Sequence, residues 1–491
     1  MPYRTAKVKG QVYDAYPHST DATRLARNIG YIVPAPVFVR YNWAATNAFH
    51  TQKISAALLT MNRRAYVLNE MGTGKTRAAL YAIDWMLTQN EIQKVLVVAP
   101  LSTLENVWAL EIMKYFPHLT SSTLYAYSRA ARLKRLNTKA DIYIVNHHGV
   151  KTILDDLIKL RPDVILIDEI ATFRNAQTDL WKSMNQLCPQ APYVWGMTGS
   201  PTPDAPTDAY GQVKLLTPTR VPKYFKAFKR DTMVQVSQFR WIPKPDATDK
   251  IHEVMQPAVR FKRDDVVELP PVSYAYRKVE SSKRQGDTYK ELMQKLVLAF
   301  NEGKIKASNE GVLFSKLLQI ASGWVYTSDK KIVDLNPNKR LDELKQVIDE
   351  SIGKVIVFAD FVHTAENVAK WLSDKRYSVA MVSGKVPAHA RNKTFGDFQN
   401  LDSPRVLVAH PKCMAHGLTL TAASTIVWYT PTTSLETYEQ ACARITRPGQ
   451  TNKQLIVHLT GTSIESKVYR RLREKASIQG ALLDLFTETQ Q

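Results

Sequence analysis

The feature that most constrains the fold of this 491-residue chain is a repeated alternation of short apolar runs with longer helical patterns. In two separate stretches, runs rich in Val and Ile are bounded by polar or turn residues, which is typical of buried parallel strands. The runs of the first stretch are Tyr66–Asn69, Val95–Ala99, Ile142–Val145, Val164–Ile167 and Val194–Met197. Those of the second are Val355–Phe358, Val379–Val382, Val406–Ala409, Ile426–Tyr429 and Leu455–Leu459. This alternation predicts two doubly wound α/β lobes with parallel sheets.

Between the two stretches, from about Thr217 to Arg340, the alternation stops and amphipathic helical patterns such as Thr288–Asn301 and Glu310–Ile320 appear. Residues 220–284 carry 15 Lys and Arg against 8 Asp and Glu, a net charge of +7. The predicted division has an N-terminal segment of unassigned role (residues 1–45), a first lobe (46–217), a basic and mainly helical insertion region (218–340), a second lobe (341–475) and a C-terminal tail (476–491).

Composition excludes several classes of protein. With 44% hydrophobic and 23% charged residues, the chain is neither largely disordered nor collagen-like. The three cysteines, Cys188, Cys413 and Cys442, lie far apart, which predicts reduced thiols and neither a disulfide framework nor a zinc site. The N-terminus lacks the apolar core of a secretion signal, and no apolar run approaches the ~18–20 residues that span a bilayer. We therefore expect a cytoplasmic protein.

Net charge indicates the kind of partner. Sixty-six Lys and Arg against 45 Asp and Glu give a formal charge of +21. A surplus of this size favours a polyanion, and nucleic acid first, because each phosphate contact releases a counterion. The alternative is a cationic surface that serves only solubility.

A phosphate-binding loop is predicted at residues 69–76, Asn-Glu-Met-Gly-Thr-Gly-Lys-Thr, which follow a strand and open the helical run Arg77–Met86. Gly72, Thr73 and Gly74 would let the backbone N–H groups face the phosphates. Lys75 would reach the β- and γ-phosphates, and the Thr76 hydroxyl would bind Mg²⁺. Asn69 stands where the strict pattern has its first glycine, and a plain glycine turn into a helix is the alternative.

The acidic half of a nucleotide site is predicted at the end of the strand Val-Ile-Leu-Ile-Asp-Glu, residues 164–169. Four apolar residues bring Asp168 to the carboxyl end of the strand, where ligands bind in such sheets. Asp168 would hold Mg²⁺, and Glu169 would orient and deprotonate the attacking water. With the phosphate loop upstream, this strand predicts hydrolysis of a nucleoside triphosphate.

The second stretch offers a basic motif from Gln440 to Gln450. Arg444 and Arg447 are three residues apart, so on a helix they would share a face and point into a cleft together. Such an arginine could stabilise charge on the γ-phosphate. A solvated basic helix end is the alternative for this pair.

Taken in this order and spacing, the motifs resemble those of helicase superfamily two, and within it the Swi/Snf-type DNA translocases, from about Phe49 to Lys475. The resemblance assigns adenine contact to Gln52, although Thr51 replaces the usual aromatic residue. It assigns contact with the DNA backbone to Ala99–Leu104, which contains Ser102 and Thr103 and is followed by Trp108 and Glu111. Thr198 and Ser200 resemble the motif that couples hydrolysis to nucleic-acid contact.

In the second stretch the resemblance assigns Gly417 to the nucleotide site and Thr419 to DNA, and it gives Gln440, Arg444 and Arg447 catalytic roles. Ala171 stands where most relatives have histidine, Thr419 where asparagine is usual, and Ala415-His416 where a glycine pair is usual. Arg260–Val266, Leu269–Pro271 and the helical stretch after them resemble the characteristic helical insertions of that group.

The resemblance implies two tandem RecA-like lobes with helical insertions between them. It also implies an ATPase that uses ATP and Mg²⁺ to move along double-stranded DNA with little strand separation, and that displaces bound protein or remodels branched DNA. We expect a monomer of a compact bacterial or phage-like form, in the cytoplasm of a bacterium or a phage-infected host. Two alternatives stay open: a strand-separating DNA or RNA helicase, and a binding module without turnover.

Overall fold

The computed structural model describes residues 4–236, 241–262, 265–266, 270, 272–301, 307–327, 329, 331–414, 419–447 and 450–474. The chain forms two compact units, residues 1–267 and 268–491. Their boundary falls inside the stretch 218–340 that the sequence assigns to an insertion region. Among the described residues, no helix has both the length and the apolar character needed to cross a membrane.

The first unit is built on a seven-stranded sheet in which every pair of neighbours is parallel. In spatial order its strands are β11 (Ala258–Val259), β3 (Arg64–Val67), β8 (Tyr193–Met197), β7 (Val164–Asp168), β4 (Val95–Ala99), β6 (Ile142–Asn146) and β5 (Ser121–Thr123). The central strands β4, β6, β7 and β8 are buried along their whole length, which is why they read as continuous apolar runs.

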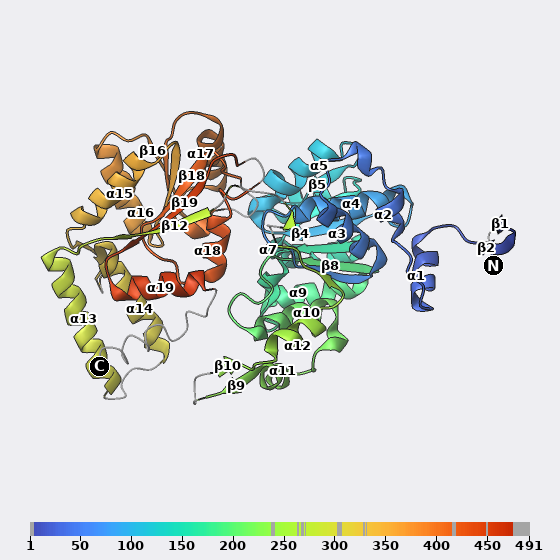
Figure 1. Cartoon of the computed structure of the whole chain (residues 1–491), viewed down its shortest axis with the longest axis horizontal. Coiled ribbons are helices and arrows are strands. Elements are labelled where there is room, and N and C mark those ends of the chain that lie inside the picture. The colour runs from blue at the N-terminus through green and yellow to red at the C-terminus, as the bar shows by residue number, and fades with distance from the viewer. Residues whose placement is uncertain are drawn as a thin grey trace. The chain divides into compact units, whose positions relative to one another are not determined.

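Helices cover both faces of this sheet (Figure 1). One face packs against α3 (His50–Met61) and α4 (Lys75–Thr88), and the other against α9 (Asp179–Leu187) and α10 (Ala209–Leu216). The other helices of the unit are α1 (Thr20–Asn28), α2 (Pro36–Arg40), α5 (Leu110–Tyr115), α6 (Arg129–Leu136), α7 (His147–Thr152), α8 (Leu154–Leu160), α11 (Phe225–Thr232) and α12 (Ala247–Val254). Two small hairpins complete it, β1 (Arg4–Val8) with β2 (Gln11–Ala15), and β9 (Met233–Gln235) with β10 (Trp241–Pro243).

The second unit repeats this plan with a six-stranded parallel sheet. Its strands, in spatial order, are β12 (Val272–Lys278), β19 (Gln454–Thr460), β18 (Ala423–Trp428), β15 (Lys354–Phe358), β17 (Val406–Ala409) and β16 (Val379–Val382). Its helices are α13 (Lys283–Asn301), α14 (Ala307–Ser322), α15 (Asn338–Glu350), α16 (Val362–Asp374), α17 (Ala388–Asn400), α18 (Leu435–Cys442) and α19 (Ser463–Arg473), with a hairpin of β13 (Trp324–Tyr326) and β14 (Ile332–Asp334).

In this unit α15 and α16 cover one face of the sheet, and α14, α17, α18 and α19 cover the other. The doubly wound α/β fold predicted from the alternation is thus confirmed in both units. Each of the ten predicted apolar runs overlaps a strand of one of the two sheets. The three cysteines are buried free thiols.

A buried ion pair connects several helices and strands of the second unit. Arg340 in α15 is 2% exposed, and its Nη2 donates to the carboxylate of fully buried Glu465 in α19 at 2.5 Å. The same guanidinium donates to the carbonyls of Ala321, Tyr429 and Leu459, at the ends of α14, β18 and β19. Five segments therefore meet at one side chain.

Arg340→Met is expected to lower the free energy of unfolding of the second unit by about 3–5 kcal/mol, because the Glu465 charge would stay buried without its partner. Chemical denaturation followed by circular dichroism measures this. Lys339→Met is the matched control, since Lys339 is exposed and its ion pair with Glu280 lies on the surface, where such pairs contribute little to stability. Equal midpoints for the two variants would contradict the role given to Arg340.

Candidate active site

The predicted phosphate loop lies between the end of β3 at Val67 and the start of α4 at Lys75. Gly72 and Gly74 have φ angles of +85° and +77°, in the left-handed region that suits glycine. Gly74 is also the residue that caps α4, and the Thr73 hydroxyl donates to the Glu70 carbonyl at 2.8 Å. The loop thus curls over the N-terminus of a helix, where the backbone N–H groups and the helix dipole favour an anion.

Gln52, which the resemblance assigns to adenine, lies buried behind this loop. Its Nε2 donates to the Gly74 carbonyl at 3.1 Å, and its Oε1 accepts from the Phe49 N–H at 2.9 Å. The side chain therefore connects the start of α3 to the phosphate loop. In this arrangement Gln52 supports the loop from behind.

Gly74→Ala is expected to reduce ATP affinity at least about tenfold, since a left-handed φ costs roughly 1–2 kcal/mol for other residues. In addition, a Cβ atom at position 74 would lie 2.2 Å from Gln52 Nε2 and clash with it. Gly353→Ala is the control, because Gly353 has a φ of +94° but open space around its Cβ position. Titration with a fluorescent ATP analogue compares the two, and wild-type affinity in Gly74→Ala would contradict the clash.

Lys75 occupies the position predicted for contact with the phosphates. Its Nζ donates to the carbonyls of Asn69 at 2.8 Å and of Glu70 at 3.2 Å. It also lies close enough to Asp168 for its charge to lower the pKa of that carboxyl. The structure therefore brings the predicted lysine and the predicted metal ligand to one place.

Asp168 ends β7 and is 8% exposed. Its burial, and then the neighbouring Glu169 charge, raise the pKa of its carboxyl to about 7, while a hydrogen bond from the Trp108 indole lowers it. A carboxylate in this position is costly without a cation, so the site favours a positive ligand. Oxygen donors from Asp168 and Thr76 fit a hard divalent cation.

That cation would need further ligands from substrate and water. The described part of the chain contains no group of three or more His, Cys, Asp or Glu side chains placed to hold a metal. Proteins usually bind Mg²⁺ through one or two carboxylates, together with substrate phosphates and waters, so a larger group of protein ligands is not needed.

Two residues support Asp168 that the sequence does not point to in this role. Trp108, in the π-helical turn Leu104–Ala109, is fully buried and its Nε1 donates to Asp168 Oδ2 at 3.0 Å. His147, at the start of α7, donates from Nε2 to the Asp168 carbonyl at 2.8 Å. The resemblance places Trp108 in a DNA-backbone motif, but its indole faces the acidic site. Neither contact could be found from spacing, because the partners are 60 and 21 residues apart.

Glu169 has a φ of +52° and stands at the turn after β7. Its Oε2 accepts from the hydroxyl of buried Thr198 at 3.2 Å, and that same hydroxyl oxygen accepts from the Ser200 N–H at 3.3 Å. The predicted general base is therefore held by the predicted coupling motif.

The predicted DNA-backbone motif has only part of its side chains free for a ligand. Thr103 is buried, and its hydroxyl donates to the Pro100 carbonyl at 2.9 Å, whereas Ser102 is partly exposed. Glu111 forms an ion pair with Arg77 at 3.0 Å and so connects α5 to α4. This motif braces the helix that follows the phosphate loop.

In the second unit, the helical face predicted for Arg444 and Arg447 does not form. Helix α18 ends at Cys442, before both arginines, which lie in the turns that follow. Arg444 is 1% exposed, whereas Arg447 is partly exposed. Gln440 is buried, and its Nε2 donates to Glu436 Oε1 within the helix. The spacing rule fails here because it assumes that the helix continues.

Arg447 contacts the other predicted motif of this unit. Its Nη1 donates to the hydroxyl of exposed Thr419 at 3.3 Å, and its Nε donates to the Ala443 carbonyl at 3.3 Å. Desolvation lowers the pKa of Arg447 to about 10, so the side chain stays cationic at neutral pH. Gly417, Ala415-His416 and the tail 476–491 lie outside the described residues.

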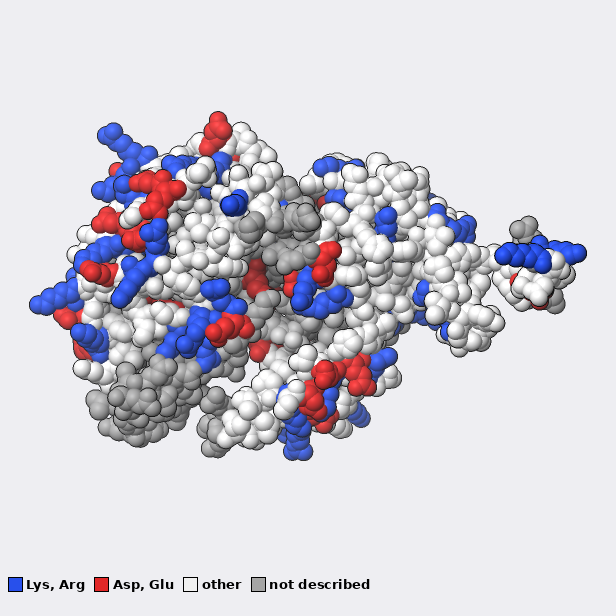
Figure 2. Space-filling model, viewed as in Figure 1, with Lys and Arg blue, Asp and Glu red and all other residues white. Residues whose placement is uncertain are grey.

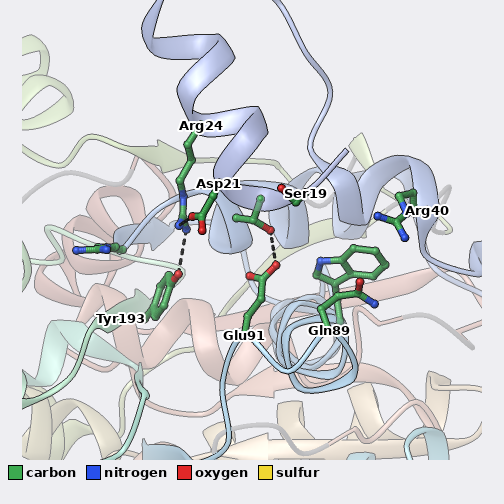
Figure 3. A pocket seen from close by; sticks show the side chains of 10 residues that line it. Ser19, Asp21, Arg24, Arg40, Gln89, Glu91 and Tyr193 are labelled. Atoms are coloured by element: carbon green, nitrogen blue, oxygen red, sulfur yellow. Dashed lines mark hydrogen bonds and ion pairs between the residues drawn. The ribbon is translucent and has the colours of Figure 1, made fainter. Parts of the chain in front are cut away.

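Helix α1 of the N-terminal segment, to which the sequence assigns no role, packs at the amino ends of strands β3 and β8 of the first sheet. Arg24 of α1 donates to the carbonyls of Thr60 and Met61, at the end of α3, and to the Tyr193 hydroxyl at the start of β8. A hollow of about 400 Å³ remains beside this contact (Figure 3). The segment thus caps α3 at the amino ends of the strands, away from the phosphate loop.

Basic side chains do not gather into one patch on the visible face of the molecule, where Lys and Arg alternate with Asp and Glu (Figure 2). On the basic helix α6, Arg129 forms an ion pair with Asp156, and Arg132 and Arg135 donate to backbone carbonyls. Charge alone therefore does not locate a nucleic-acid surface on this face.

Comparison with known proteins gives consistent matches. Residues 53–323 match the SNF2-related domain, and residues 339–449 match the helicase conserved C-terminal domain. A phage protein, "Putative protein p41" of Acyrthosiphon pisum secondary endosymbiont phage 1, is 26% identical over 86% of this chain and 95% of its own length.

Larger relatives match over a similar share of the chain. The CHD3-type chromatin-remodeling factor CHR7 of Arabidopsis thaliana is 22% identical over 86% of this chain, and the human DNA annealing helicase and endonuclease ZRANB3 is 22% identical over 87%. The chain spans only 34% and 39% of those two proteins. The Sulfolobus solfataricus SWI2/SNF2 ATPase core in complex with dsDNA matches at 20% identity and a TM-score of 0.43, covering 87% of this chain and 91% of that structure.

Proposed function

This chain belongs to the SNF2-related family of helicase-type ATPases, and from that premise we propose that it hydrolyses ATP to move along double-stranded DNA and to displace bound protein or remodel branched DNA. The observation that carries the proposal is the convergence of Lys75, Asp168 and Glu169 in the first unit. Lys75 lowers the pKa of Asp168 through space, and Glu169 is held by Thr198.

In this site Lys75 would leave the loop carbonyls to bind the β- and γ-phosphates, which the loop N–H groups also face. Asp168 and Thr76 would hold Mg²⁺, which neutralises charge on the phosphates when bound. Glu169 would orient and deprotonate the attacking water. Because Thr198 bonds to Glu169, a change in the coupling motif would alter the position of this base.

The second unit would contribute Arg447, whose guanidinium is cationic, partly exposed and oriented by Thr419. An arginine that meets the γ-phosphate stabilises its developing charge and makes hydrolysis depend on closure of the two units. Buried Arg444 would position this turn from within.

Double-stranded DNA is the proposed track. The net charge of +21 favours a polyanion. Two of the relatives are named as a chromatin-remodeling factor and as a DNA annealing helicase and endonuclease. Partly exposed Ser102 and Ser200 in the first unit, and exposed Thr419 in the second, remain the candidate contacts with the phosphate backbone.

Steady-state ATP hydrolysis at one salt concentration tests this proposal, measured without nucleic acid and with duplex DNA, single-stranded DNA or duplex RNA. We expect duplex DNA to stimulate turnover most. Displacement of a third strand from a DNA triplex, dependent on ATP, would then demonstrate movement along the duplex. Stimulation mainly by single strands or by RNA would instead indicate a strand-separating helicase, and no turnover at all would leave a binding module.

A further inference from the structure

Asn69, the first residue of the phosphate loop, joins that loop to a segment almost 200 residues further along the chain. Its side chain is 2% exposed and makes two hydrogen bonds. Asn69 Oδ1 accepts from the Phe261 N–H at 3.0 Å, and Asn69 Nδ2 donates to the Ser55 hydroxyl at 3.0 Å. A glycine, which the strict loop pattern has at this position, could make neither bond.

The peptide unit between Asn69 and Glu70 makes a second connection. Its carbonyl accepts from Lys75 Nζ at 2.8 Å, and its N–H donates to the Phe261 carbonyl at 2.9 Å. A peptide unit is planar and rigid, so a rotation that changes one of these hydrogen bonds changes the other. The Asn69–Glu70 peptide unit is therefore hydrogen-bonded to Lys75 on one side and to Phe261 on the other.

Residue 261 ends a run of parallel pairing that β11 begins. The N–H groups of Tyr66, Leu68 and Glu70 donate in turn to the carbonyls of Pro257, Val259 and Phe261. The chain then passes through residues 262–271 and enters the second unit, whose first strand β12 begins at Val272. The segment held by the phosphate loop is thus the start of the connection between the two units.

We propose that the Asn69–Glu70 peptide, held in place by the Asn69 side chain, transmits occupancy of the phosphate loop to the connection between the units. The proposal rests on ATP binding at this loop, as in the proposed function. A phosphate that takes the Lys75 ammonium removes the donor from the Asn69 carbonyl. The plane then turns, and its N–H shifts the Phe261 carbonyl, which it contacts directly. Asn69 is a positioning residue in this scheme.

Hydrogen exchange of the full chain, with and without Mg²⁺ and a non-hydrolysable ATP analogue, tests the link without DNA. In the wild type we expect amide exchange in residues 257–262 to change at least about fivefold on nucleotide binding, the effect of about one net hydrogen bond. Asn69→Gly should lose this response although it restores the strict loop pattern. An unchanged response in Asn69→Gly, or no response in the wild type, would overturn the proposal.

Two further variants separate transmission from packing. Ser55→Ala removes the other hydrogen bond of Asn69 and should keep the response of residues 257–262. Phe261→Pro removes the N–H that Asn69 accepts without altering the loop, and it should lose the response and lower the ratio of DNA-stimulated to basal turnover about fivefold or more. The double variant with Asn69→Gly and Phe261→Pro should show no larger fall in the ratio of DNA-stimulated to basal turnover than either single variant, because both changes break the same link. A full response in Phe261→Pro, or additive losses, would contradict the link.

The experiment also separates this link from the proposed function. If duplex DNA fails to stimulate the wild type while residues 257–262 still respond to nucleotide, the translocase proposal fails and the link stands. If DNA stimulates the wild type and every variant equally, the link fails alone.

Discussion

Replacing Lys75 with alanine is expected to reduce ATP hydrolysis by at least about 10²- to 10³-fold, with or without duplex DNA, the loss typical of one preorganised donor at a reacting centre. The structure places this ammonium against the loop carbonyls and close to Asp168. Its loss removes the group that would bind the β- and γ-phosphates. Steady-state phosphate release measures the effect, and filter binding should show that most DNA affinity remains.

Lys159→Ala is the matched control, since Lys159 is an exposed lysine of the same unit in the last turn of α8. It should hydrolyse ATP at the wild-type rate. Thermal unfolding of both variants checks that the first unit stays folded. If Lys75→Ala retained DNA-stimulated turnover near the wild-type rate, the assignment of the phosphate loop would be wrong.

Replacing Arg447 with alanine is expected to slow turnover by about 10³-fold or more while ATP binding is retained, as for other arginines that enter a phosphoryl-transfer site from outside. The side chain is partly exposed, and its Nη1 and Nε are oriented by Thr419 and Ala443. Single-turnover hydrolysis at saturating ATP separates the chemical step from binding.

Arg447→Lys should recover only a part of this loss, because lysine keeps the charge without the planar fork. Arg470→Ala, on the exposed side of α19, should have no effect. An unaltered kcat in Arg447→Ala rules out a role on the γ-phosphate, whereas a loss of ATP affinity with normal kcat would make Arg447 a binding residue only.

The central strands of both sheets could be predicted from sequence because they are buried on both faces and read as unbroken apolar runs, as in Val95–Ala99 and Val406–Ala409. Two of the edge strands, β11 and β12, could not, whereas the edge strand β16 was predicted as the run Val379–Val382. β11 has only two residues, Ala258 and Val259, and β12 has the pattern Val-Ser-Tyr-Ala-Tyr-Arg-Lys with four exposed side chains. Both lie in the basic stretch that lacks the alternation of apolar runs and helical patterns. Their extended conformation follows from pairing with the neighbouring strands β3 and β19.

At the site, the residues with fixed spacing to a strand end were predictable, as for Lys75 after β3 and Asp168 at the end of β7. The residues that hold them were not, because tertiary contacts decide which side chain meets which. Trp108 reaches Asp168 from 60 residues away, and Phe261 reaches Asn69 from 192. Local spacing can also mislead. The spacing of Arg444 and Arg447 predicted that both lie on one helix, but α18 ends at Cys442, two residues before Arg444.

The placement of β11 beside β3 matters for any attempt to divide the chain. A fragment that stopped before Ala258 would leave the backbone of β3 unpaired along one side, directly next to the phosphate loop. An exposed edge strand with unpaired N–H and C=O groups can pair with other chains and cause aggregation. A fragment of the first unit therefore needs residues 257–261 from the central basic stretch to keep this side of β3 paired.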